Sequence, residues 1–157
     1  MTMRLLVGSL VALSVGCHSR PESAVLRYPG SSFAARIERS ATHLFLAEYD
    51  RVLVLERDGR EVARRAMFPD SGGYGRTNAY DLGQSKTLLL SAFDAYVLDY
   101  DRAEIRALDR NGAAARGTYI GAFDSDTDGH WRFIGAAEKP EASVEPKGGR
   151  RGMRRPT

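Results

Sequence analysis

Three aspartates at alternate positions form the clearest chemical motif in the sequence. Segment 124–129 reads Asp-Ser-Asp-Thr-Asp-Gly, and His130 follows it directly. Alternating acidic residues closed by a glycine place several oxygens on one side of a tight loop, and oxygens are the ligands that Ca²⁺ prefers. His130 is placed to add a backbone carbonyl. We therefore expect a calcium site whose ligands are Asp124, Asp126, Asp128 and His130.

The motif resembles the first half of an EF-hand loop, and also the D-x-D-x-D-G hairpin loops of calcium-binding propeller repeats. The second half of the EF-hand pattern is missing, because its twelfth position is Gly135 and not the bidentate glutamate. Strand-like sequences on both sides of the loop also argue against a helix–loop–helix. The alternative is a polar turn whose aspartate side chains accept hydrogen bonds from the backbone.

A second candidate site is the glycine-rich segment 69–76, Pro-Asp-Ser-Gly-Gly-Tyr-Gly-Arg. Its glycines allow a ligand close approach to the backbone, and Tyr74 and Arg76 add an aromatic ring and a cation. The segment is not a P-loop or a dinucleotide fingerprint, because the spacing differs and no Lys-Ser/Thr follows. It predicts either a ligand or partner loop, with Tyr74 and Arg76 as its contacts, or a plain connection.

Familiar catalytic constellations are missing from the sequence. It contains no G-x-S-x-G elbow, no histidine pair at metal-ligand spacing and one cysteine. His43 and His130 adjoin apolar residues, which indicates packing positions more than acid–base catalysts. We name no catalytic residue and favour a protein that binds over one that catalyses.

The first 17 residues indicate where the chain works. Arg4 supplies a short positive region, Leu5–Val15 is an apolar run, and Gly16 and Cys17 follow. These are the parts of an export signal, and the run is shorter than the roughly 20 residues that span a bilayer. The last four residues, Ser-Val-Gly-Cys, resemble the lipobox of bacterial lipoproteins, although Ser14 replaces the usual leucine.

This resemblance implies cleavage before Cys17 and acylation of its side chain. Two or three acyl chains anchor a protein stably where one does not. His18, and not aspartate, follows the cysteine, which implies the outer membrane of a bacterial envelope, with the domain on the periplasmic side by default. The alternative is an ordinary secretory signal with an incidental cysteine.

Composition divides the chain into four segments. Residues 1–16 are the signal, 17–23 the lipidated cysteine and its tether, 24–137 a single domain and 138–157 a disordered basic tail. The net charge of +3 comes from the tail, since acidic residues outnumber basic ones between 18 and 144. The tail either contacts anionic lipid or lipopolysaccharide or solubilises the protein, and the compartment argues against nucleic acid. Its basic cluster is Arg150, Arg151, Arg154 and Arg155.

Short strand-like runs predict an all-β domain of antiparallel meanders. Asp58-Gly59 between two runs indicates a tight hairpin, and Trp131 and Phe133 alternate with a polar residue, so both should face the core. Two meanders repeat at an offset of 44 residues, a spacing found in propeller blades, but two blades cannot close a propeller. We expect a small sandwich or partly open barrel, with a propeller-like repeat as the alternative. A helix over Asp101–Arg116 would contradict the all-β class. The predicted strands cover 24–28, 33–38, 43–49, 51–57, 60–67, 87–93, 95–100, 103–108 and 118–124.

A lipid-anchored β domain without a catalytic motif predicts a non-enzymatic binding module, docked as an accessory subunit on an envelope protein assembly. Two alternatives stay open. One is an immunity- or inhibitor-type lipoprotein, and the other is a small envelope hydrolase with a calcium-supported loop. A docking subunit should expose an apolar patch or an unpaired strand edge, whereas a hydrolase should hold carboxylates in a cleft beside the glycine-rich loop.

Overall fold

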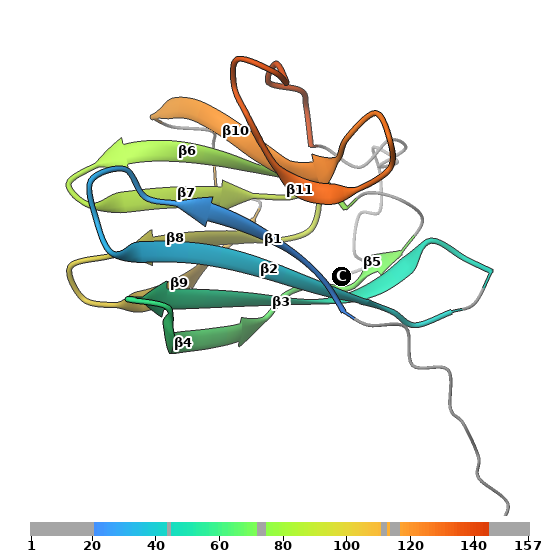
Figure 1. The fold of residues 1–157 in the computed structure, drawn as a ribbon, viewed down its shortest axis with the longest axis horizontal. Helices are drawn as coiled ribbons and strands as arrows, with labels where there is room; N and C mark the ends of the chain where they lie inside the picture. The colour runs from blue at the N-terminus through green and yellow to red at the C-terminus, as the bar shows by residue number, and fades with distance from the viewer. Residues whose placement is uncertain (1–20, 44, 72–74, 111–112, 114–116, 145–157) are drawn as a thin grey trace, which may run out of the picture.

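The computed structural model describes residues 21–43, 45–71, 75–110, 113 and 117–144, and these residues form β-strands and no α-helix. The strands lie in two layers (Figure 1). The described part of the range Asp101–Arg116 contains a β-strand, Glu104–Leu108, in place of the helix that would contradict the all-β class. The strands are β1 (Glu22–Arg27), β2 (Phe33–Ala41), β3 (Glu48–Arg57), β4 (Arg60–Ala66), β5 (Asp70–Ser71), β6 (Thr77–Gly83), β7 (Lys86–Leu90), β8 (Ala95–Asp99), β9 (Glu104–Leu108), β10 (Thr118–Ser125) and β11 (Trp131–Gly135).

The first sheet is an antiparallel meander of β1, β2, β3 and β4, and the short β5 pairs with the start of β3. Asp58 and Gly59 both have positive φ, 52° and 72°, as a type I′ turn requires. This confirms the hairpin that Asp-Gly predicts. Arg36 forms ion pairs with Glu38 and Glu56 across the outer face of the sheet. This face therefore carries charged side chains, as is typical of a face in contact with solvent.

The second sheet has the order β11-β10-β6-β7-β8-β9 and is also antiparallel throughout. The chain enters it at β6, follows a meander to β9, and returns to the other side of β6 as β10 and β11. The pairing of β10 with β6 shifts register between Tyr119 and Gly121. Gly121 has a φ of 144° at this irregularity.

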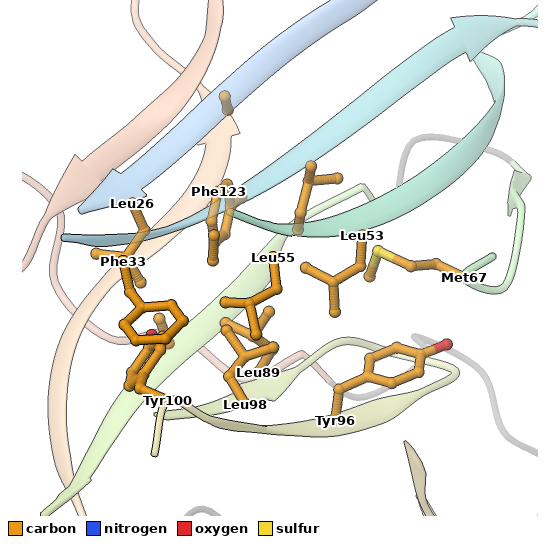
Figure 2. Close-up of a cluster of buried hydrophobic side chains, with 14 of the residues drawn as sticks. Leu26, Phe33, Leu53, Leu55, Met67, Leu89, Tyr96, Leu98, Tyr100 and Phe123 are labelled. Atoms are coloured by element: carbon orange, nitrogen blue, oxygen red, sulfur yellow. The ribbon is translucent and has the colours of Figure 1, made fainter. Parts of the chain in front are cut away.

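The core lies between the two sheets, which confirms the sandwich. Leu53 and Leu55 of β3 face Leu89 and Leu98 of the second sheet, and Phe123 of β10 closes the same cluster (Figure 2). All five side chains are fully buried. Burial of apolar side chains between two layers is the main stabilising contribution in such a fold. Trp131 belongs to this cluster and Phe133 packs against it, as their alternation predicts.

The sheet edges face each other in pairs. β1 contacts β11 along one side of the sandwich, and β4 contacts β9 along the other. Facing edges are poor templates for strand addition, and the exposed side chains of β4 are mostly charged, which discourages pairing further. Among the described residues, the three most exposed large apolar side chains lie instead in connections, at Phe45, Leu46 and Phe68.

The strand register gathers the longer connections at one end of the sandwich, here called the loop end. It comprises Glu22 at the start of β1 and the connections 42–47, 67–76, 91–94 and 126–130. The opposite end carries the turns 28–32, 58–59, 84–85 and 100–103 (Figure 1). The first chain segment of the domain thus enters at the end where the surface connections accumulate.

Two details of the predicted repeat and strands are wrong. The offset of 44 residues aligns Val54 with Leu98, but the inward residues of β3 are Leu53 and Leu55. Because successive strand residues point to opposite faces, the aligned residues lie on different sides and the two meanders are not copies. Of the predicted strand 43–49, Glu48 and Tyr49 lie at the start of β3, whereas the described residues 43 and 45–47 form a connection.

Ordered contacts of the sandwich reach past both ends of the range 24–137. β1 begins at Glu22, within the expected tether, because Ala24 and Leu26 bury their side chains in the core. At the other end, residues 138–144 lie on the outer face of the second sheet. Asn78 Nδ2 donates to the carbonyl of Ala142 at 2.9 Å, and Tyr80 OH lies 2.8 Å from Glu141 Oε1. Glu141 and Ala142 thus contact two side chains of β6.

Buried tyrosines make the fold sensitive to alkaline pH. Burial raises the pKa of Tyr80, Tyr96 and Tyr100 to about 12. The unfolded chain loses these protons near pH 10 whereas the folded chain keeps them, so the free energy of unfolding falls as pH rises from 10 towards 12. We expect a clearly lower urea midpoint at pH 11 than at pH 9, and a smaller difference for Tyr100→Phe. Equal midpoints at the two pH values would contradict this.

Candidate functional site

A cleft of about 240 Å³ opens at the loop end. Its walls come from both sheets and include two segments that the sequence singles out, the aspartate loop and the glycine-rich connection. Its volume is below the roughly 300 Å³ at which sites for drug-sized ligands begin, so it suits a single side chain or a small polar group. The lining residues are Arg39, Ala47, Tyr49, Asp70, Gly75, Asp124, Ser125, Gly129 and Trp131.

Arg39 is the cation of the cleft and is held between two aromatic rings. Its guanidinium carbon lies 4.4 Å from the centroids of both Tyr49 and Trp131. Its NH2 lies 2.6 Å from Oε2 of Glu22, at the start of β1. Cation–π contacts and an ion pair fix the guanidinium in one position. The cleft is therefore coupled directly to the point where the chain enters the sandwich.

The aspartate loop is a hairpin turn built around Asp126. Oδ1 of Asp126 accepts the backbone N–H groups of Asp128 at 3.0 Å and His130 at 2.9 Å, and Oδ2 accepts Nε of Arg132 at 2.9 Å. The hydrogen bond from His130, with those from Arg132 and Asp128, holds the pKa of Asp126 below its usual range. Asp126 therefore stabilises the turn as a charged carboxylate.

Asp124 joins the aspartate loop to the glycine-rich connection. Its Oδ2 lies 2.6 Å from Nζ of Lys139 and 3.8 Å from NH1 of Arg76. Arg76 also donates to Tyr119 OH at 3.0 Å and to the carbonyl of Pro140 at 2.8 Å. The two candidate sites of the sequence thus form one charged neighbourhood at the loop end.

Arg51 fixes the connection 67–76 from inside the sandwich. It is 2% exposed, and its NH2 donates to the carbonyl of Phe68 at 2.8 Å. Its NH1 donates to Thr77 Oγ1 at 3.2 Å and to the carbonyl of Gly75 at 3.5 Å. Asp94 Oδ1 lies 3.7 Å from NH2 and supplies the opposite charge. One buried cation thus holds both ends of the glycine-rich connection.

Asp70 is itself part of this connection and is almost fully buried. A Cβ added to Gly75 would lie 2.7 Å from Asp70 Oδ2, so the glycine permits this close approach. The cleft therefore combines a guanidinium, two carboxylates and two aromatic rings. Such a set can hold a cationic or hydroxyl-bearing group against the carboxylates, with an aromatic wall behind it.

Some of the predicted site residues lie outside the described part of the chain. These are Cys17, Tyr74 and the basic cluster Arg150, Arg151, Arg154 and Arg155. Arg76 and Asp124 lie together at the loop end, and Asp126, Asp128 and His130 each have a potential ligand atom within 4.8 Å of the others. The residues that sequence reasoning missed are Arg39, Tyr49, Arg51 and Lys139, whose roles arise from long-range contacts that no local motif reports.

Calcium binding by the aspartate loop stays a prediction. Asp124 and Asp126 already pair with Lys139 and Arg132, so a cation has to compete with these partners. If Ca²⁺ binds, the melting temperature should be higher in millimolar Ca²⁺ than in EDTA, because a ligand of the folded state stabilises it. Asp128→Ala should remove that shift and spare the three hydrogen bonds that the Asp126 carboxylate accepts. An identical melting temperature of the unaltered protein in Ca²⁺ and EDTA would contradict the prediction.

Large apolar side chains are exposed at the loop end. Phe45 is 89% exposed and Leu46 54%, both in the connection between β2 and β3. Phe68 is 51% exposed in the connection that follows β4, and its ring lies 5.0 Å from that of Phe93. Exposed aromatic and aliphatic groups of this size commonly mark a contact surface.

Comparison with known proteins adds no assignment. No protein-family model, curated protein or solved structure matches the chain. Within the described part of the chain, no helix has the length and apolar character needed to cross a membrane. Functional inference therefore depends on the loop end and on the first 17 residues.

Proposed function

We propose that this chain is a lipid-anchored protein of a bacterial envelope that acts as a non-enzymatic binding module, an accessory subunit of a protein assembly. The lipobox-like sequence ending at Cys17 supports the anchor. Acyl chains on that cysteine would hold the sandwich beside a membrane. The protein would then meet its partner at the membrane surface.

One observation carries the proposal: apolar side chains are exposed at the same end of the sandwich at which the tether enters. Glu22 begins β1 at the loop end, and Phe68 is half-exposed there with Phe93 beside it. An apolar surface next to a membrane tether is suited to a partner that lies in or on that membrane. The adjacent small cleft is of a size to accept one side chain of that partner.

The hydrolase alternative is favoured by a different observation. Asp70 and Asp124 line the cleft beside Gly75, which is the arrangement expected of such an enzyme. Two carboxylates in one cleft can share acid and base roles in hydrolysis. Hydrolysis of an envelope polymer that is lost in Asp70→Asn, while the melting temperature is retained, would support this alternative over the binding module.

Site-specific photo-crosslinking tests the binding module. A photoreactive amino acid replaces Phe68 in the full chain, and the control carries it at Val62, which is 42% exposed on β4 and lies towards the opposite end. We expect one discrete product with an envelope protein from position 68 and none from position 62. The same products from both positions, or none from either, would contradict the proposal.

A further inference from the structure

We propose that the tip of the β2–β3 hairpin, carrying Phe45 and Leu46, inserts into the surface layer of the lipid bilayer to which the protein is anchored. This inference rests on the lipid anchor of the proposed function. It assigns the tip to lipid and leaves the Phe68–Phe93 pair to the protein partner. The anchored domain would thereby have a defined orientation on the membrane.

The tip presents Phe45 and Leu46 outward on a closed turn. The backbone N–H of Thr42 donates to the carbonyl of Glu48 at 3.0 Å, and that of Glu48 donates to the carbonyl of Leu46 at 2.8 Å. These bonds close the connection at its base. Phe45 and Leu46, 89% and 54% exposed, lie beyond them. They are the two most exposed large apolar residues in the described part of the chain.

The charge of the tip favours lipid over water or a polar partner. Residues 42–47 read Thr-His-Leu-Phe-Leu-Ala and contain no aspartate, glutamate, lysine or arginine. The first charged residue after them is Glu48, at the base of the hairpin. Aromatic and aliphatic side chains without nearby carboxylates partition readily into the interfacial region of a bilayer.

The tether places the tip next to the membrane. Cys17 precedes Glu22 by five residues, so the acylated cysteine lies within about 18 Å of Glu22 even in a fully extended chain. Glu22 pairs with Arg39 of β2, and β2 continues past that point to Ala41 before the tip begins. The tip therefore projects beyond the attachment point at the loop end (Figure 1). A domain held this closely by its loop end presents Phe45 and Leu46 to the bilayer.

Fluorescence quenching by brominated lipid tests the insertion. Full-length, acylated protein purified from membranes is reconstituted into phosphatidylethanolamine–phosphatidylglycerol vesicles with ordinary or brominated acyl chains, and mass spectrometry first confirms the acyl group on Cys17. The variant is Phe45→Trp, with Leu46→Trp as a second position. The matched control is Val62→Trp, and the unaltered protein reports the background of Trp131, which is buried.

We expect brominated vesicles to quench Phe45→Trp several-fold more strongly than Val62→Trp, with a blue-shifted emission for the former. Equal quenching of the two variants in protein shown to be acylated would overturn the insertion and leave the anchor intact. Equal quenching together with a photo-crosslink from position 45 to an envelope protein would assign the tip to that partner instead. If mass spectrometry finds no acyl group on Cys17 and the protein does not bind the vesicles, both the proposed function and the insertion are overturned.

Discussion

Arg51→Ala is expected to cost the fold about 3 kcal/mol or more of unfolding free energy. The substitution removes the buried donors that satisfy the carbonyls of Phe68 and Gly75, and it leaves Asp94 without its cation. Buried polar groups that lose a partner carry their full desolvation cost. Urea unfolding measures the change, and the melting temperature should fall by on the order of 10 °C.

Arg64→Ala is the matched control, because Arg64, like Arg51, is an arginine that forms an ion pair with a carboxylate. Its ion pairs with Glu61 and Glu38 lie on the exposed outer face of the first sheet, where water and salt weaken them. Its loss should therefore be several times smaller than that of Arg51. Equal losses for the two variants would show that Arg51 does not organise the connection 67–76.

Gly121→Ala is expected to destabilise the sandwich by roughly 2–5 kcal/mol, from strain and overpacking together. Gly121 has a φ of 144°, a conformation that side chains rarely adopt. A Cβ there would lie 2.3 Å from the carbonyl oxygen of Ile134, a backbone atom that cannot rotate away. Chemical unfolding again measures the difference.

The control for this substitution lies directly across the ladder. Gly135 pairs with Gly121, and a Cβ added to Gly135 meets no atom within 4 Å. Gly135→Ala should be near neutral, because it adds a methyl group in open space and restricts the unfolded chain. A loss as large as that of Gly121→Ala would mean that the ladder rejects any side chain and that the close approach at Gly121 is not the cause.

Local patterns predicted those parts of the fold whose cause is local. The positive φ at Asp58 and Gly59 follows from residue type alone, and the meander β7 to β9 follows from three adjacent apolar runs. β6 (Thr77–Gly83) escaped prediction because both of its faces are covered, so no alternation marks it. Ala79 packs in the core between the sheets, whereas Asn78 and Tyr80 bond residues 141–142 on the outer face.

The candidate site likewise has one part that the local sequence predicts and one part that depends on long-range contacts. The aspartate loop is recognisable because Asp126 bonds residues two and four positions along the chain. The cleft is not, since Arg39, Trp131 and Asp70 come from distant segments. The segment His43–Tyr49 has the composition of a core strand, yet Phe45 and Leu46 are exposed. The last residue pair between β2 and β3 is Ala41 with Tyr49. Phe45 and Leu46 lie beyond this pair, and the sequence alone does not report where the pairing ends.

The most direct test of the binding module is its recovery from native membranes. Epitope-tagged protein at its native level is solubilised in mild detergent, and its companions are quantified by mass spectrometry, with the Cys17→Ser chain as control. We predict an acylated peptide beginning at Cys17 and one envelope protein recovered at a constant ratio. If that companion is a toxin or a hydrolase, the protein is of the immunity or inhibitor type. Recovery of the acylated protein alone, at every detergent concentration that keeps known envelope complexes intact, would contradict the binding module.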